Sequence, residues 1–132
     1  LYRRLDGGEP VHLVLPNPDL VYPAGGGGWG LASASVAGLL ETALQFRYPD
    51  RTDLTFTRLG KPHPAMFEEA LRRSGTRNMV MIGDQPETDV RGARAFGIDS
   101  VLVDGNGPPS RVETLPPHLR PTYRMDALAL HP

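Results

Sequence analysis

The chain has 132 residues, a formal net charge of −1 and no cysteine. A chain of this size is one domain at most, and disulfides, thiolate chemistry and zinc–cysteine sites are excluded. The basic residues are scattered and no apolar run is long enough to cross a bilayer, which argues against nucleic-acid and membrane partners. We therefore expect a soluble cytoplasmic protein. Because the sequence begins with Leu1, we expect a processed, cut or incompletely represented chain.

The first half of the chain predicts two strands, a glycine-rich loop and a helix. The apolar run at residues 11–15 does not alternate, which suits a strand covered on both faces. A flexible glycine loop is expected at residues 25–30. Apolar residues at helical spacing predict a helix at residues 31–46, and a second short strand follows at residues 55–59.

The second half predicts a regular alternation of helices and strands. Pro64 suits the first turn of a helix that ends at Gly75. The further elements are a strand at 79–82, a helix at 89–96, a strand at 100–103, an edge strand at 122–125 and a short terminal helix. Strands alternating with helices indicate parallel βαβ units, so we expect an α/β fold with a Rossmann-like parallel sheet.

Polar residues follow three of these strands at their carboxyl ends, where ligands gather in such sheets. They are Asp19, Lys61 and Asp84. A lysine is a point charge that can lie between a nucleophilic carboxylate and phosphoryl oxygens, and phosphoryl transfer depends on such neutralisation. The alternative for Lys61 is an ordinary surface lysine.

The sequence Gly-Asp-Gln-Pro-Glu-Thr-Asp at residues 83–89 follows an apolar strand. Asp84 is there a natural ligand for Mg²⁺, which takes one or two carboxylates together with water and phosphate oxygens. Asp89 either caps the next helix or orders the metal and the lysine. These residues together predict a site for a phosphate and a divalent metal.

Gly-Lys-Pro at residues 60–62 and the motif at residues 83–89 resemble the third and fourth motifs of the haloacid dehalogenase (HAD) superfamily. Asn-Pro-Asp at 17–19 and Tyr-Pro at 22–23 narrow the resemblance to the branch with a large α/β cap inserted mid-chain. That branch includes 4-nitrophenyl phosphatase, phosphoglycolate phosphatase, pyridoxal phosphatase and the NagD-like phosphatases. The resemblance extends from residue 11 to residue 107.

The resemblance implies a Mg²⁺-dependent phosphatase that hydrolyses a small phosphate monoester through an aspartyl phosphate. It implies that Lys61 steadies the nucleophile and the transferring phosphoryl group. Asp84 and Asp89 would form the metal site, and Asn17 and Asp19 would line the mouth of the substrate site together with Lys61. The expected ligand is a small phosphorylated metabolite.

The nucleophile motif of that superfamily, Asp-x-Asp-Gly, does not occur in the sequence. Asp6 follows a polar stretch, and Asp104 lies beyond the fourth motif, so neither qualifies. We therefore expect residues 1–10 to be the end of a cap or a cap–core linker. Residues 11–132 are expected to form the C-terminal half of a core domain, without the N-terminal strand and most of the cap. Alone, such a chain is expected to be inactive.

Three other functions are possible from the sequence. A truncated, non-catalytic interaction module would expose apolar surface and form a homodimer or associate with a missing N-terminal half. Residues 28–33 partly imitate a dinucleotide-binding motif, but Ser33 replaces its third glycine. A receiver-like domain would need an acidic pair near the start, which is absent. The four histidines show no metal-ligand spacing.

Overall fold

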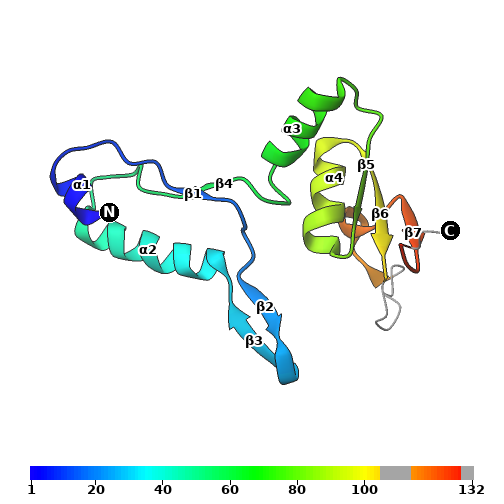
Figure 1. The fold of residues 1–132 in the computed structure, drawn as a ribbon, viewed down its shortest axis with the longest axis horizontal. Helices are drawn as coiled ribbons and strands as arrows, with labels where there is room; N and C mark the ends of the chain where they lie inside the picture. The colour runs from blue at the N-terminus through cyan, green and yellow to red at the C-terminus, as the bar shows by residue number, and fades with distance from the viewer. Residues whose placement is uncertain (105–113, 129–132) are drawn as a thin grey trace. The chain divides into compact units, whose positions relative to one another are not determined.

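The computed structural model describes residues 1–104 and 114–128 and divides the chain into two compact units (Figure 1). The first unit is Leu1–Gly60 and the second begins at Lys61. No helix in the described residues is both long and apolar enough to span a bilayer. The predicted boundary between residues 10 and 11 stays a prediction, but Leu5 is buried in the core of the first unit.

The first unit contains two helices, a hairpin and a short parallel strand pair. Its elements are α1 (Tyr2–Asp6), β1 (Val14–Leu15), β2 (Val21–Ala24), the 3₁₀ turn η1 (Gly25–Gly27), β3 (Gly28–Leu31), α2 (Ser33–Arg47) and β4 (Thr57–Arg58). β1 pairs with β4 in parallel, with Val14 opposite Thr57. The strands predicted at 11–15 and 55–59 are therefore present, but each has only two residues, in β1 and β4.

Two small apolar clusters hold the first unit together. One contains Leu5, Leu44 and Leu54, and the other contains Leu15 with alanines of α2. At the end of α2, Asp6 accepts hydrogen bonds from the Tyr48 hydroxyl at 2.6 Å and from the Arg47 guanidinium at 2.9 Å. The Tyr48 hydroxyl and the Arg47 cation lower the pKa of the Asp6 carboxyl. This cluster ties α1 to the far end of α2.

The glycine-rich segment forms an antiparallel hairpin, which corrects the predicted flexible loop. Only η1 is the turn, and its Gly26 and Gly27 have φ of 76° and 80°, values that glycine adopts readily. Across the hairpin Tyr22 pairs with Gly30, where a side chain would collide with the tyrosine ring. Gly28 and Gly30 thus lie in a hairpin strand and not in a strand-to-helix turn, so the geometry of a dinucleotide-binding motif is not formed.

The second unit is a three-stranded parallel sheet with helices packed on it. Its elements are α3 (Ala65–Ser74), β5 (Val80–Gly83), the π-helical turn η2 (Pro86–Val90), α4 (Arg91–Phe96), β6 (Asp99–Val103), the 3₁₀ turn η4 (Pro117–Leu119) and β7 (Tyr123–Met125). The strand order is β5-β6-β7, and Figure 1 shows α4 alongside the sheet. Parallel strands with flanking helices confirm the predicted Rossmann-like α/β fold.

One prediction for this unit needs correction, and one of its strands is more exposed than its apolar sequence suggests. In β5, Val80 and Ile82 are 48% and 44% exposed. In the described residues β5 pairs only with β6, so one edge of it carries no strand. The helix predicted from Asp89 begins instead as η2 and becomes α-helical at Arg91. The predicted terminal helix and the loop at 105–107 lie largely or wholly outside the described residues.

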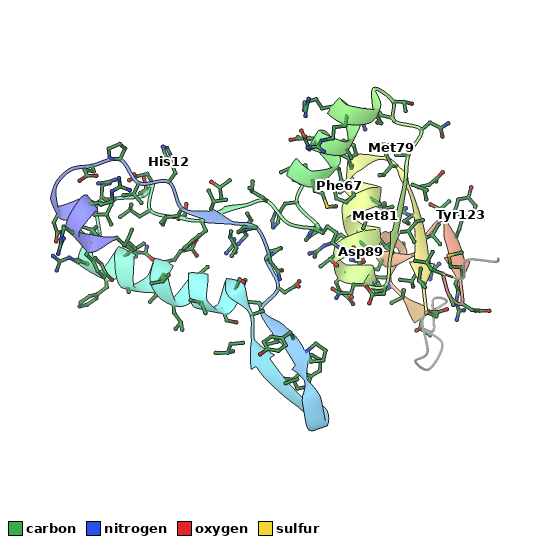
Figure 2. All side chains as sticks on the ribbon, in the orientation of Figure 1. His12, Phe67, Met79, Met81, Asp89 and Tyr123 are labelled. Carbon is green, nitrogen blue, oxygen red and sulfur yellow. The ribbon has the colours of Figure 1, made fainter. Side chains whose placement is uncertain are left out.

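The buried apolar residues of the second unit come from α3, η2, α4 and β6. Phe67 of α3 is buried, and its ring stacks on that of Phe96 with centroids 5.6 Å apart (Figure 2). A Cβ atom on Gly92 would lie 2.7 Å from the Phe67 ring and 3.1 Å from Pro62 Cα. Gly92 therefore sets how closely α3 and the Lys61–Pro62 segment approach α4.

Gly92→Ala should lower the free energy of unfolding by up to about 2 kcal/mol. Overpacking costs about 1–3 kcal/mol, and the better helix propensity of alanine offsets about 1 kcal/mol of that. Gly38 of α2 provides the control, because a Cβ there meets no atom within 4 Å. Thermal unfolding followed by circular dichroism should show destabilisation by Gly92→Ala alone. Equal effects of both substitutions would contradict the packing argument.

Candidate active site

Three of the predicted site residues lie in the second unit. Lys61 begins that unit, and the peptide bond from Lys61 to Pro62 is cis. β5 ends at Gly83, so Asp84 follows directly at the carboxyl end of a parallel strand, as expected. Asp89 lies in η2, on the turn that carries the chain from β5 into α4.

The loop after β5 closes around the carboxylate of Asp89. Its Oδ2 accepts a hydrogen bond from the backbone N–H of Gln85 at 3.1 Å, and its own N–H donates to the Gln85 carbonyl at 2.9 Å. The carboxylate lies directly against Gly83, where any Cβ atom would overlap it. The glycine thus creates the space in which the acid is buried, and the resulting turn is π-helical, a form frequent at functional sites.

Lys61 and Asp89 form an ion pair with the acid buried and the lysine partly exposed. Lys61 Nζ is 2.5 Å from Asp89 Oδ1, and the two side chains are 37% and 2% exposed. Asp89 Oδ1 has no well-aligned hydrogen-bond donor, so the ammonium group balances it by charge and not through a directional bond. A buried carboxylate without a cation would be costly, which explains why the pair persists. Figure 2 shows Asp89 beside α4.

Asp89 does not precede α4, because that residue is Val90, and no side chain caps that helix. Asp89 lies in the first turn of η2, where its carboxylate accepts the Gln85 N–H and pairs with the Lys61 ammonium group. The two roles considered for Asp89 therefore both stay predictions. Its predicted role as a metal ligand stays a prediction, and both of its oxygens already have a partner.

Lys61 carries a sequence signal that the motif analysis missed. It is the only lysine of the chain, because the other basic side chains among the 14 are arginines. Lysine carries a compact ammonium group on a flexible side chain, whereas the guanidinium group of arginine is planar. The two are therefore not interchangeable at a site that binds a single ligand oxygen atom. The isolated lysine therefore marks this position without reference to any motif.

Asp84 is an exposed carboxylate, and oxygen ligands of this kind suit Mg²⁺. The described residues contain no group of three or more histidine, cysteine, aspartate or glutamate side chains that could hold a metal ion. Asp84 can therefore supply one ligand of such an ion, with the other positions filled from elsewhere. That is compatible with Mg²⁺, which commonly keeps several waters and substrate oxygens.

The remaining two predicted residues lie in the first unit, on the loop after β1. Asn17 Oδ1 accepts a hydrogen bond from the backbone N–H of Asp19 at 2.9 Å, which forms a local Asx turn. The Asp19 carbonyl accepts the N–H of Ala34 at the start of α2. Gly60 lies against the Pro16 carbonyl, where a Cβ atom would clash. The close approach of residue 60 to the Pro16 carbonyl thus requires the glycine of Gly-Lys-Pro.

Asp104, the aspartate set aside in the search for a nucleophile, follows β6. Its carboxylate is 5% exposed and forms an ion pair with Arg124 of β7. This contact joins the ends of two neighbouring strands. The structure thus gives Asp104 a role in holding the sheet.

The family model for HAD-like hydrolases matches residues 58–130, more than half of the chain. This range contains Lys61, Asp84 and Asp89. The chain belongs to the HAD-like hydrolase family.

Several relatives of this HAD-like chain are named as phosphatases. It is 32% identical to the dihydroxyacetone phosphatase of Corynebacterium glutamicum over 122 residues, which are 90% of this chain. It is similar to the magnesium complex of a glycerol phosphate phosphatase from Mycobacterium tuberculosis, with 30% identity, a TM-score of 0.67 and 92% of this chain covered. It also matches p-nitrophenyl phosphatase from Archaeoglobus fulgidus, with 25% identity, a TM-score of 0.64 and 95% coverage.

The HAD-like chain is much shorter than these relatives. It spans 40% of the dihydroxyacetone phosphatase, 34% of the glycerol phosphate phosphatase and 46% of the p-nitrophenyl phosphatase. The matches confirm the predicted superfamily and its NagD-like phosphatase branch.

Proposed function

We propose that the protein to which this chain belongs is a Mg²⁺-dependent phosphatase of small phosphate monoesters, acting through an aspartyl-phosphate intermediate. The observation that carries the proposal is the ion pair between Lys61, which precedes α3, and Asp89, which lies in the turn that follows β5. The named phosphatases among its relatives support the same reaction class. Their substrates differ, so the proposal extends only to a small phosphorylated metabolite.

Each of these residues has a separate task in this proposal. Lys61 offers its partly exposed ammonium group to the phosphoryl oxygens and the attacking carboxylate, since charge neutralisation dominates phosphoryl transfer. Asp89 fixes the position of that ammonium group from its buried side. Gln85 holds the other oxygen of Asp89 in place through its N–H. Asn17 and Asp19 are proposed to contact the substrate at the mouth of the site.

Asp84 is the residue proposed to hold the metal. A Mg²⁺ ion bound there would neutralise phosphoryl oxygens and orient the phosphate. Its remaining ligands would be water, substrate and residues beyond those described. Asp89 is proposed to support that arrangement through Lys61.

The 132-residue chain alone should not turn over 4-nitrophenyl phosphate, because the sequence contains no Asp-x-Asp-Gly nucleophile motif. The protein expressed from its complete coding sequence should release phosphate steadily when Mg²⁺ is present. Removal of Mg²⁺ with EDTA should abolish release, and re-addition should restore it. The measurement is the rate of 4-nitrophenolate formation by both proteins, side by side. Steady turnover by the short chain that Lys61→Ala abolishes would overturn the nucleophile assignment.

A non-catalytic interaction module is the second candidate. The exposed apolar side chains of β5, Val80 and Ile82, favour it, because the described residues leave that edge without a strand. It predicts that the complete product has no phosphatase activity and self-associates in sedimentation experiments. An active monomer would exclude it.

A further inference from the structure

A polar cavity of about 350 Å³ lies in the second unit, at the amino-terminal ends of the sheet strands. Asn78 and Met79 precede β5, Asp99 begins β6, and Thr122 precedes β7, and all four line it. Its volume is at the lower end of the roughly 300–1,000 Å³ typical of small-molecule sites. The cavity therefore has room for a small ligand.

Three arginines converge on this cavity from three different segments. Arg77 comes from the loop before β5, Arg94 from the last turn of α4, and Arg120 from the end of η4. Asp99 is the one acidic residue among the described residues of the lining. Within the described residues, neither Arg77 nor Arg94 forms an ion pair with a carboxylate.

Two of the three guanidinium groups are held in place by the protein. Arg77 lies 4.6 Å above the Phe96 ring and donates a hydrogen bond to the Phe96 carbonyl at 2.7 Å. The Nε of Arg120 donates to the Leu115 carbonyl at 2.9 Å. Donors that are already ordered lose less conformational entropy when a ligand binds. The cluster is thus partly preorganised for an anion.

We propose that this cavity binds a phosphate dianion, either inorganic phosphate or the phosphoryl group of a small molecule. Arginine suits phosphate because its planar donors match two phosphate oxygens at once. The positive charges of Arg77 and Arg94 would offset the charge of −1.5 to −2 that a phosphate monoester carries near pH 7. With three arginines around a small volume, the cavity fits a compact anion and not an extended polymer.

The cavity and the candidate active site are separate. The arginine cavity lies at the amino ends of the strands, whereas Asp84 follows the carboxyl end of β5. β5 has four residues, so the two ends are about 13 Å apart along the strand. Phosphate binding in the cavity therefore does not require Lys61 or a metal, and the proposal stands independently of the phosphatase activity.

The test is a titration of the ¹⁵N-labelled 132-residue chain with inorganic phosphate, at constant ionic strength maintained with sodium chloride. The amides of Gly97 and Ile98, which line the cavity, should shift and saturate. Arg94→Gln should weaken binding about tenfold, the effect of losing one charged hydrogen bond. Arg73→Gln also removes one positive charge, but from α3 and outside the cavity, so the affinity for phosphate should stay within about twofold of the wild-type value. Lys61→Ala should leave the affinity of the cavity for phosphate unchanged.

Two further arms complete the experiment. Asp99→Asn removes the one acid among the described lining residues and should tighten binding roughly two- to fivefold. This variant tests the proposal even if an arginine variant does not fold. Titration with methyl phosphate identifies the source, since tighter binding than inorganic phosphate indicates an organic phosphate. The proposal is overturned by the absence of saturable shifts, by equal weakening from Arg94→Gln and Arg73→Gln, or by loss of the shifts in Lys61→Ala.

Discussion

The turnover number of the complete protein should fall about 100- to 1,000-fold when Lys61 is replaced by alanine. This is the range observed when one preorganised charge or donor facing the transition state is removed. Lys61 is suited to that task because its side chain is 37% exposed while its ammonium group is held by the buried Asp89 carboxylate. Initial rates with 4-nitrophenyl phosphate at saturating Mg²⁺ provide the measurement.

Two companion variants make the Lys61 experiment specific. Lys61→Arg keeps the charge but replaces a compact ammonium group with a planar guanidinium group. Its activity should therefore lie between that of Lys61→Ala and that of the wild type. Arg73→Ala removes one positive charge from α3, where Arg73 pairs with Glu69, and should leave turnover within about twofold. If Lys61→Ala retains more than a tenth of the wild-type rate, the lysine does not serve the transition state.

Asp89→Ala should lower the free energy of unfolding of the chain by about 2–3 kcal/mol. The substitution removes the acceptor of the Gln85 N–H and leaves that donor inside the loop. Breaking a fully buried ion pair costs about 3–5 kcal/mol, but Lys61 is partly exposed and water can solvate it once the acid is gone. The expected loss is therefore below that range.

Glu87 is a matched control for Asp89. It lies in the same turn, carries the same charge and is exposed. Glu87→Ala should change the free energy of unfolding by no more than about 0.5 kcal/mol, as for most surface substitutions. Urea denaturation of the two variants beside the wild type measures the difference. Similar small effects from both would mean that the buried carboxylate is not a structural requirement of the loop.

The sequence predicts the second unit better than the first because its signals are local. The apolar runs at β5 and β6 and the glycines after α3 and α4 place these elements within one or two residues. The β2–β3 hairpin was missed because its pairing of Tyr22 with Gly30 depends on a cross-strand contact, which no periodicity records. The π-helical turn η2 depends on the Asp89 carboxylate folding back onto Gln85, again a contact beyond a local pattern.

In the candidate site, too, features set by local sequence could be predicted, and contacts between distant residues could not. The positions of Lys61 and Asp84 after their strands follow from motifs and from the geometry of parallel sheets. The ion pair of Lys61 with Asp89 joins residues 28 positions apart. Ordering of the lysine was one of the two roles expected for Asp89, and the local helix-capping signals could not decide between them. The space that Gly83 provides for that carboxylate is likewise visible only in three dimensions.

The single lysine gives this chain an unusual chemical selectivity. Reagents specific for primary amines meet only the Lys61 ammonium group and the amino terminus. Reductive methylation with ¹³C-labelled formaldehyde would therefore place one side-chain NMR reporter beside the buried Asp89 carboxylate. That signal would follow phosphate or metal binding at the loop directly, without any substitution in the protein.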